Sequence, residues 1–180
     1  MAPFKILALS GSLRQASTNT ALLGAARLLA LPELQINIWQ GTEYLPHFSP
    51  DIEDAPPPEV LHLRKLVGDC DALLIACPEY ARGVPGSFKN LLDWLVGGET
   101  FVNKKVALWN ASPRASEAQK SLRLVLETMS GEIIEEAALG IPLISKSVTA
   151  QSLASDAAFA PMILAALEEF ANCLRGAKTV

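Results

Sequence analysis

The chain has 180 residues, of which half are hydrophobic and 19% are charged, and its formal net charge is −4. This composition is typical of a globular protein, and we expect residues 1–180 to form a single domain. Basic residues form no stripe, which disfavours nucleic acid as a partner, and no apolar run approaches the roughly 18 residues that a membrane span needs.

Strand-like and helix-like patterns alternate along the chain. Short apolar runs without polar alternation suit strands that are buried on both faces, and apolar residues spaced three and four apart suit helices. In chain order we expect a strand at 4–9, a helix after Ser17, an edge strand at 34–39, an irregular proline-rich loop at 40–57, a helix at 58–68, a strand at 71–77, a helix at 88–95 that Gly97 and Gly98 end, a strand at 105–111, a helix at 116–130, a weaker edge strand at 132–139 and a helix at about 156–175 with Ser155 or Asp156 as its cap.

This alternation predicts a doubly wound α/β fold with right-handed crossovers and helices on both faces of the sheet. The length suits a five-stranded parallel sheet of flavodoxin-like order, 2-1-3-4-5. In that order the first and third strands are neighbours whose connections run to opposite sides. A ligand crevice is therefore expected between their carboxyl ends.

The cysteines and the N-terminus indicate the compartment. Cys70, Cys77 and Cys173 have no metal-binding spacing, and the chain contains no CxxC. Reduced thiols in the cytoplasm are the simplest interpretation. The apolar run before Ser10 is too short for the core of a signal peptide, so we expect a soluble cytoplasmic protein without a membrane partner and without a metal.

The loop after the first strand, SGSLRQASTN at 10–19, has the composition of a phosphate site. Gly11 permits a close turn, hydroxyls and an amide supply donors, and Arg14 supplies a charged fork. Ser17 is a candidate N-cap, so the positive end of the first helix points to the same place. The alternative is that residues 17–19 only cap a helix and Arg14 lies on the surface. The patterns GxxxxGK[ST] and GxGxxG are both absent, which excludes the common ATP and dinucleotide loops.

The loop after the third strand reads CPEYARGVPGSFKNLLDW at 77–94. Its glycines and prolines suit the edge of a flat heterocycle bound by main-chain N–H groups. Taken together, GSLRxxSxN and PEYxxGxPGxxKNxxDW resemble the NAD(P)H-dependent FMN reductase family, a flavodoxin-like family with relatives that reduce quinones, azo dyes and chromate. The resemblance covers about residues 4–130 and includes ASPRASEAQKSLR at 111–123, which is similar to the loop and helix after the family's fourth strand.

The resemblance implies FMN as cofactor, NADPH or NADH as electron donor, and a cleft between these loops. It implies that the phosphate is held in the first loop by Ser10, Ser12, Arg14, Ser17, Thr18 and Asn19. It implies that the ring is contacted by Pro78, Glu79, Tyr80, Ala81, Arg82, Gly83 and Ser112. Many relatives have Asn where this chain has Ala81, and a glycine pair where it has Ser116 and Glu117.

The implied reaction is hydride transfer from NAD(P)H to the N5 atom of FMN, followed by two-electron reduction of a small acceptor, such as a quinone, an azo dye, free flavin or a metal oxyanion. No general acid or base is needed, so no catalytic side chain is expected beyond the ring environment of Glu79, Tyr80 and Arg82. Family members commonly form homodimers or homotetramers, and the resemblance implies the same here. The alternative is a flavodoxin-type electron carrier, although the chain lacks the strong negative charge and the aromatic residue in the first loop typical of such carriers. A response-regulator-like domain is disfavoured because the third strand ends in Cys77 and Pro78 rather than in an acidic cluster.

Overall fold

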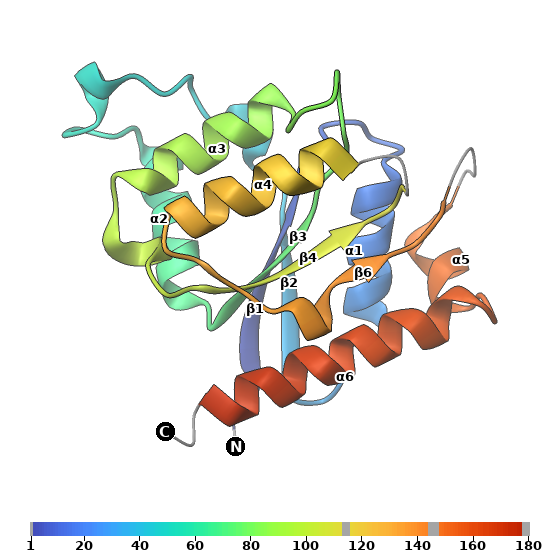
Figure 1. Ribbon diagram of the computed structural model, residues 1–180. Helices are drawn as coiled ribbons and strands as arrows, with labels where there is room; N and C mark the ends of the chain where they lie inside the picture. Colours follow the sequence, from blue (N-terminus) through green and yellow to red (C-terminus); the bar gives the residue numbers. More distant parts are fainter. Residues whose placement is uncertain (1, 113–115, 144–147, 178–180) are drawn as a thin grey trace.

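A parallel sheet forms the centre of the computed structural model, which describes residues 2–112, 116–143 and 148–177 (Figure 1). The strand order is β2-β1-β3-β4-β5, as expected from the sequence. The five strands on this path are β1 (Phe4–Ser10), β2 (Leu34–Trp39), β3 (Ala72–Ala76), β4 (Lys105–Asn110) and β5 (Glu132–Ile133). The pairing places Ser10 at the end of β1 opposite Ala76 of β3, so the two loops that follow start side by side.

Helices cover both faces of this sheet. Helices α1 (Thr18–Leu28), α5 (Ala150–Ala154) and α6 (Phe159–Ala177) lie on one face, and α2 (Pro58–Asp69), α3 (Gly86–Val96) and α4 (Ser116–Thr128) lie on the other. Ile6 and Ala8 of β1 pack toward the first set, while Leu7 and Leu9 pack toward the second. Because alternate side chains enter two separate cores, residues 6–9 of the strand are all apolar, and this produces the run seen in the sequence.

The strand expected at 132–139 is not continuous. It is divided into β5 and β6 (Leu139–Gly140), which both pair with β4, and a 3₁₀ turn at Glu135–Ala137 separates them. The turn brings the carbonyl of Ala137 to 2.9 Å from the indole nitrogen of Trp109, which donates a hydrogen bond to it. A buried indole N–H needs an acceptor, and the break in the strand supplies one.

The C-terminal helix also differs from expectation in its start. Asp156 caps it, as expected, with its carboxylate accepting from the backbone N–H groups of Ala158 and Phe159. The regular helix α6 begins only at Phe159, and the short helix α5 before it was not expected. A five-residue helix leaves no periodic apolar signal, and α5 instead depends on a capping box between Thr149 and Ser152.

The proline-rich loop at 40–57 is irregular, as expected, apart from two short 3₁₀ turns at Thr42–Tyr44 and Pro50–Ile52. Helix α3 holds this loop through two side chains. The Asn90 amide donates to the carbonyl of Pro46 and accepts from the N–H of Phe48, and the Trp94 indole donates to the carbonyl of Pro46 at 2.8 Å. Trp94 is fully buried and belongs to the core on this face of the sheet. In the described part of the chain, no helix is both long and apolar enough to cross a membrane.

Candidate functional site

The loops after β1 and β3 touch at Gly11. Its N–H donates to the carbonyl of Ala76 at 2.8 Å, and a Cβ atom at this position would lie 2.6 Å from the Cys77 sulfur and 3.1 Å from Cδ of Pro78. Only glycine fits at so short a separation. Two segments about 65 residues apart in the sequence therefore meet at the carboxyl ends of adjacent parallel strands, where ligands bind in this class of fold.

Hydroxyl groups give the first loop its shape. The Ser10 hydroxyl lies 2.8 Å from that of Thr20 and accepts from the N–H of Ser12 at 3.3 Å. The Ser12 hydroxyl in turn accepts from the N–H of Arg14 at 3.3 Å. Ser17 is the N-cap of α1, as expected, with its hydroxyl accepting from the N–H of Thr20 at 3.2 Å. The sequence argument did not identify Thr20, whose hydroxyl fixes Ser10 at the end of β1.

Several donors at this loop have no partner among the residues that the structure describes. The Arg14 side chain is exposed, and its guanidinium makes no hydrogen bond or ion pair with any residue that the structure describes. Within the same limits, the backbone N–H groups of Thr18 and Asn19 at the start of α1 are also unpaired. Unpaired amides at a helix start, together with a guanidinium, form a place where an anion is stabilised.

Asn19 connects the first loop to the end of β4. Its side chain is only 5% exposed, and its amide oxygen accepts from the N–H of Ala111 at 3.4 Å. Asn110, at the end of β4, accepts from the N–H of Ser112 at 2.9 Å. Asn19 thus positions the loop that carries Ser112 beside the first loop. Residues 113–115, which continue that loop, lie outside the described residues.

The second loop folds into a tight turn. Tyr80 and Gly83 exchange two backbone hydrogen bonds of 3.1 and 3.0 Å, and the residues between them have positive φ angles, 50° at Ala81 and 61° at Arg82. Left-handed backbone at two successive residues defines a type I′ turn, which favours Asn and Gly. Ala81 adopts this conformation at a cost of about 1 kcal/mol.

Replacing Ala81 with glycine should therefore stabilise the protein by up to about 1 kcal/mol, because glycine adopts positive φ without strain. Urea denaturation of both proteins measures the change. Ala138 is the matched control, since its φ is −69° and Ala138→Gly should be destabilising. If Ala81→Gly lowered the stability as much as the control does, the turn would not be strained.

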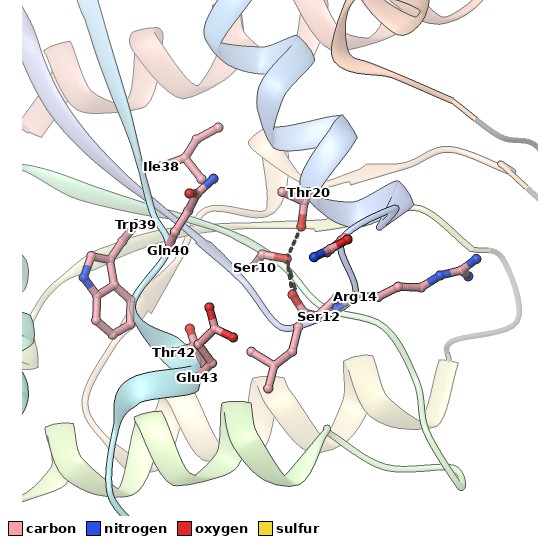
Figure 2. Close-up of a pocket in the computed structure, with 11 residues that line it drawn as sticks. Ser10, Ser12, Arg14, Thr20, Ile38, Trp39, Gln40, Thr42 and Glu43 are labelled. Carbon is pink, nitrogen blue, oxygen red and sulfur yellow. Dashed lines mark hydrogen bonds between the residues drawn. The ribbon is translucent and has the colours of Figure 1, made fainter.

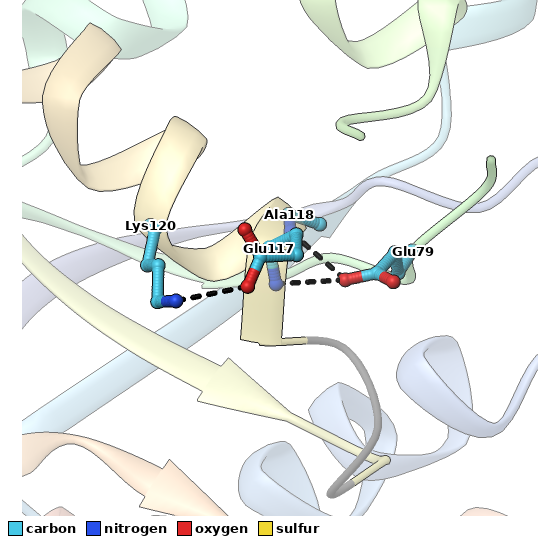
Figure 3. A network of polar contacts seen from close by, with 4 residues as sticks. All are labelled: Glu79, Glu117, Ala118 and Lys120. Carbon is cyan, nitrogen blue, oxygen red and sulfur yellow. Dashed lines mark hydrogen bonds and ion pairs between the residues drawn. The ribbon is translucent and has the colours of Figure 1, made fainter. Parts of the chain in front are cut away.

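Glu79 joins the second loop to α4. One oxygen of its carboxylate accepts from the N–H groups of both Glu117 and Ala118, each at 2.9 Å, as Figure 3 shows. Lys120 donates to the Glu117 carboxylate at 2.8 Å, and this contact holds the pKa of Glu117 below its usual range. The Glu79 side chain is thus used to cap a helix rather than being presented to the cleft, and what it leaves for a ligand is its backbone.

We expect Glu79→Gln to lower the free energy of unfolding by about 1–2 kcal/mol, because it removes a charged acceptor from two amides and from the positive helix end. Chemical denaturation measures this loss. Glu127→Gln, an exposed change on the same helix, should cost much less. Equal effects of the two substitutions would show that the cap contributes nothing.

Cys77 lies next to Gly11 at the site, but its thiol is not reactive. Its side chain is fully buried, and burial raises the pKa of its thiol to about 12. A thiol with this pKa carries almost no thiolate near neutral pH and is a poor nucleophile. Cys77 acts as a small packing residue beside Gly11.

A pocket of about 320 Å³ opens on the other flank of the first loop (Figure 2). One wall comes from the first loop and α1, with Ser10, Ser12 and Thr20, and the opposite wall comes from the end of β2 and the turn after it, with Trp39 and Glu43. A ligand crevice was expected between β1 and β3, whereas this pocket lies between β1 and β2. On the β3 side, the contact of Gly11 with the second loop fills the space directly between the strands.

Comparisons with known proteins identify the family and the fold. The family model described as NADPH-dependent FMN reductase matches residues 4–145, which include both loops. The NAD(P)H-dependent FMN reductase PA1204 of Pseudomonas aeruginosa is 34% identical over 128 residues, covering 68% of this chain and 69% of that protein. The NADPH:quinone oxidoreductase of Arabidopsis thaliana is 40% identical over 95 residues, so that the match spans 50% of this chain and about half (48%) of that relative. Among solved structures, one similar protein is FerB, a flavoenzyme NAD(P)H:(acceptor) oxidoreductase from Paracoccus denitrificans. Its TM-score is 0.80 at 24% identity, and the superposition covers 96% of this chain and 98% of the FerB chain.

Proposed function

Because the chain belongs to the NADPH-dependent FMN reductase family, we propose that it is an NAD(P)H-dependent FMN oxidoreductase that reduces a small acceptor by two electrons. The observation that carries this proposal is the contact at Gly11, where the two family motifs meet at the ends of β1 and β3. Quinones are the proposed class of acceptor, since several relatives are named for quinone reduction. An azo dye, free flavin or a metal oxyanion remain alternatives of similar chemistry.

The first loop is the proposed phosphate site. Arg14 supplies a guanidinium with no partner among the described residues, and the unpaired N–H groups of Thr18 and Asn19 add the positive end of α1. An FMN phosphate carries about −1.5 to −2 charge, and these groups suit a dianion. Ser10, Ser12 and Ser17 hold the loop in shape through their hydroxyls and remain candidates for direct contact.

The second loop is the proposed ring site. The tight turn from Tyr80 to Gly83 fixes the backbone beside Pro78, and the small Ala81 side chain leaves one face of a ring open to donor and acceptor. Arg82 offers positive charge at the same turn. Glu79 anchors the turn to α4, and Asn19 anchors the strand end that precedes Ser112. These hydrogen bonds fix the first loop, the second loop and the segment that carries Ser112 relative to one another before a ligand binds. Fewer residues then have to become ordered on binding, which lowers its entropic cost.

FMN, when bound, supplies the chemistry by accepting a hydride from the nicotinamide and passing two electrons on. The chain's own part is to hold phosphate and ring, to leave one ring face uncovered and to place backbone N–H groups near the ring edge. Cys77 takes no part because its thiol is buried and protonated.

Assembly and location belong to the same proposal. A homodimer or homotetramer is proposed because Leu61, Val96 and Leu124 are exposed on the helices that share one face of the sheet. A cytoplasmic location is proposed from the free state of Cys70, Cys77 and Cys173.

The test is oxidation of NADH or NADPH by the FMN-loaded chain with benzoquinone as acceptor. The reaction is monitored as the loss of absorbance of the reduced nicotinamide. We expect oxidation that requires both FMN and the quinone. A protein that binds FMN but leaves the nicotinamide reduced would be an electron carrier of flavodoxin type. A protein that does not bind FMN would contradict both functions.

A further inference from the structure

The pocket on the β2 side of the first loop has a wall that the proposed FMN site does not use. That wall is built by the end of β2 and the 3₁₀ turn at Thr42–Tyr44, and it contains Trp39, Gln40 and Glu43. The pocket has a volume of about 320 Å³, which is at the small end of the roughly 300–1,000 Å³ usual for ligand pockets. The pocket thus has room for one nucleoside but not for a whole dinucleotide.

Trp39 gives this pocket a flat aromatic surface. Trp94 and Trp109 are fully buried and donate their indole N–H groups to backbone carbonyls, whereas Trp39 is only partly buried. Gly41 leaves room for the Trp39 indole, because a Cβ atom at position 41 would lie 2.3 Å from the ring, and Trp39 packs against the core on that face of the sheet. A partly exposed indole held in place is a surface on which a nucleobase stacks.

Glu43 gives the same pocket an unpaired acceptor. Its carboxylate is directed into the space between Trp39 and the first loop in Figure 2, and it forms no ion pair or hydrogen bond with any residue that the structure describes. In dinucleotide-binding α/β folds that carry GxGxxG, an acidic residue after the second strand accepts from ribose hydroxyls while phosphate lies at the first loop. This chain lacks that motif, but Glu43 follows β2 by four residues and stands at a comparable place beside the first loop.

We propose that this pocket binds the nucleoside 5′-phosphate half of a dinucleotide, with the base on Trp39 and the ribose hydroxyls at Glu43. The phosphate then lies toward Ser12, at the edge of the first loop. This inference rests on the proposed function, which supplies two sources of such a group: the nicotinamide dinucleotide donor and the adenylate half of a flavin dinucleotide. In either case the first loop lies between the flavin ring site and this pocket.

The donor source has a consequence for specificity. A 2′-phosphate on the ribose would stand beside the Glu43 carboxylate, and like charges in contact are unfavourable. If the pocket receives the donor, NADH is accepted more readily than NADPH. Glu43→Gln removes the repulsion and should raise the kcat/KM for NADPH relative to NADH by about ten-fold.

Calorimetric titration of the FMN-loaded chain with 5′-AMP tests the site itself. We expect saturable binding that Glu43→Gln weakens about ten-fold, because the variant lacks the charged acceptor. Gly41→Ala should also weaken it by displacing the indole, although φ at position 41 is −102° and alanine fits the backbone. Glu127→Gln is the matched control and should bind AMP like the unchanged chain. The absence of AMP binding, or equal binding in all these variants, would overturn the proposal.

Three further measurements separate the possible outcomes. AMP that competes with NADH, together with the shifted NADPH preference in Glu43→Gln, identifies the donor as the source. FAD that binds more tightly than FMN, with the difference lost in Glu43→Gln, identifies the flavin dinucleotide. If inorganic phosphate displaced AMP as effectively as a nucleoside phosphate does, only the first loop would be binding AMP. This result would overturn the proposal. Each titration begins with FMN binding, so failure of the proposed function appears at that step and is distinct from failure of this one.

Discussion

Arg14→Ala is expected to weaken FMN binding by roughly 10- to 100-fold. A charge-assisted hydrogen bond between guanidinium and phosphate contributes about 1.5–3 kcal/mol, and about 1.4 kcal/mol corresponds to a factor of ten. The side chain is exposed and has no partner among the described residues, so its loss should leave the folded structure intact. Titration of the apoprotein with FMN, followed through quenching of flavin fluorescence, measures the change.

Two controls make the Arg14 result specific. Arg27→Ala removes an exposed guanidinium from the far end of α1 and should not alter FMN affinity. Riboflavin has no phosphate, so its affinity should be the same for the unchanged chain and for Arg14→Ala. If riboflavin and FMN lost affinity equally, Arg14 would contact the ring or support the loop, and the phosphate assignment would be wrong.

Gly11→Ala is expected to destabilise the fold by about 1–3 kcal/mol and to weaken FMN binding as well. The added methyl group would stand 2.6 Å from the Cys77 sulfur and 3.1 Å from the Cys77 Cα, so the backbone of one loop has to move. Because this contact sets the separation of phosphate site and ring site, the shift should reach both. Urea denaturation and FMN titration on the same samples measure the two effects.

Gly176→Ala provides the comparison for this substitution. A Cβ atom at Gly176 in α6 would meet nothing within 4 Å, and alanine should leave the stability unchanged or slightly higher. FMN affinity should not change. A stable Gly11→Ala protein with normal FMN affinity would show that the two loops do not need this close contact.

The sequence predicted the sheet because its physical signal is local. The middle of each central strand is buried on both faces and is therefore apolar, as residues 72–76 show, and the helices between strands carry apolar residues at the spacing of one face. The division of the fifth strand was not predicted. It depends on the contact between Trp109 and the carbonyl of Ala137, two residues far apart in sequence whose relation no periodic pattern reveals.

The meeting of the two loops was predicted from the sequence, whereas the directions of their side chains were not. The strand order alone brings residues 10–19 beside residues 77–87, and the contact at Gly11 agrees. The tertiary neighbours decide where each side chain points: Glu79 turns to the start of α4, and Asn19 turns to Ala111. The positive φ of Arg82 could not be expected from its residue type, because arginine has no preference for left-handed backbone.

The pocket at the end of β2 is hard to predict from the sequence for a related reason. Trp39 and Glu43 lie on separate elements, a strand end and a 3₁₀ turn, and neither belongs to a motif. The usable signal was the spacing of Trp39, Gly41 and Glu43 directly after an edge strand beside the phosphate loop. A small residue between an aromatic and an acidic one lets the aromatic ring fold back over the chain, as the structure shows.

A crystal structure of this chain with FMN would show whether the first loop holds the phosphate and the second loop holds the ring. We expect phosphate oxygens within hydrogen-bonding distance of Arg14 and of the backbone N–H groups of Thr18 and Asn19, with the ring against the turn from Tyr80 to Gly83. A phosphate located beside Glu43, or a ring that touches none of residues 78–83, would contradict it.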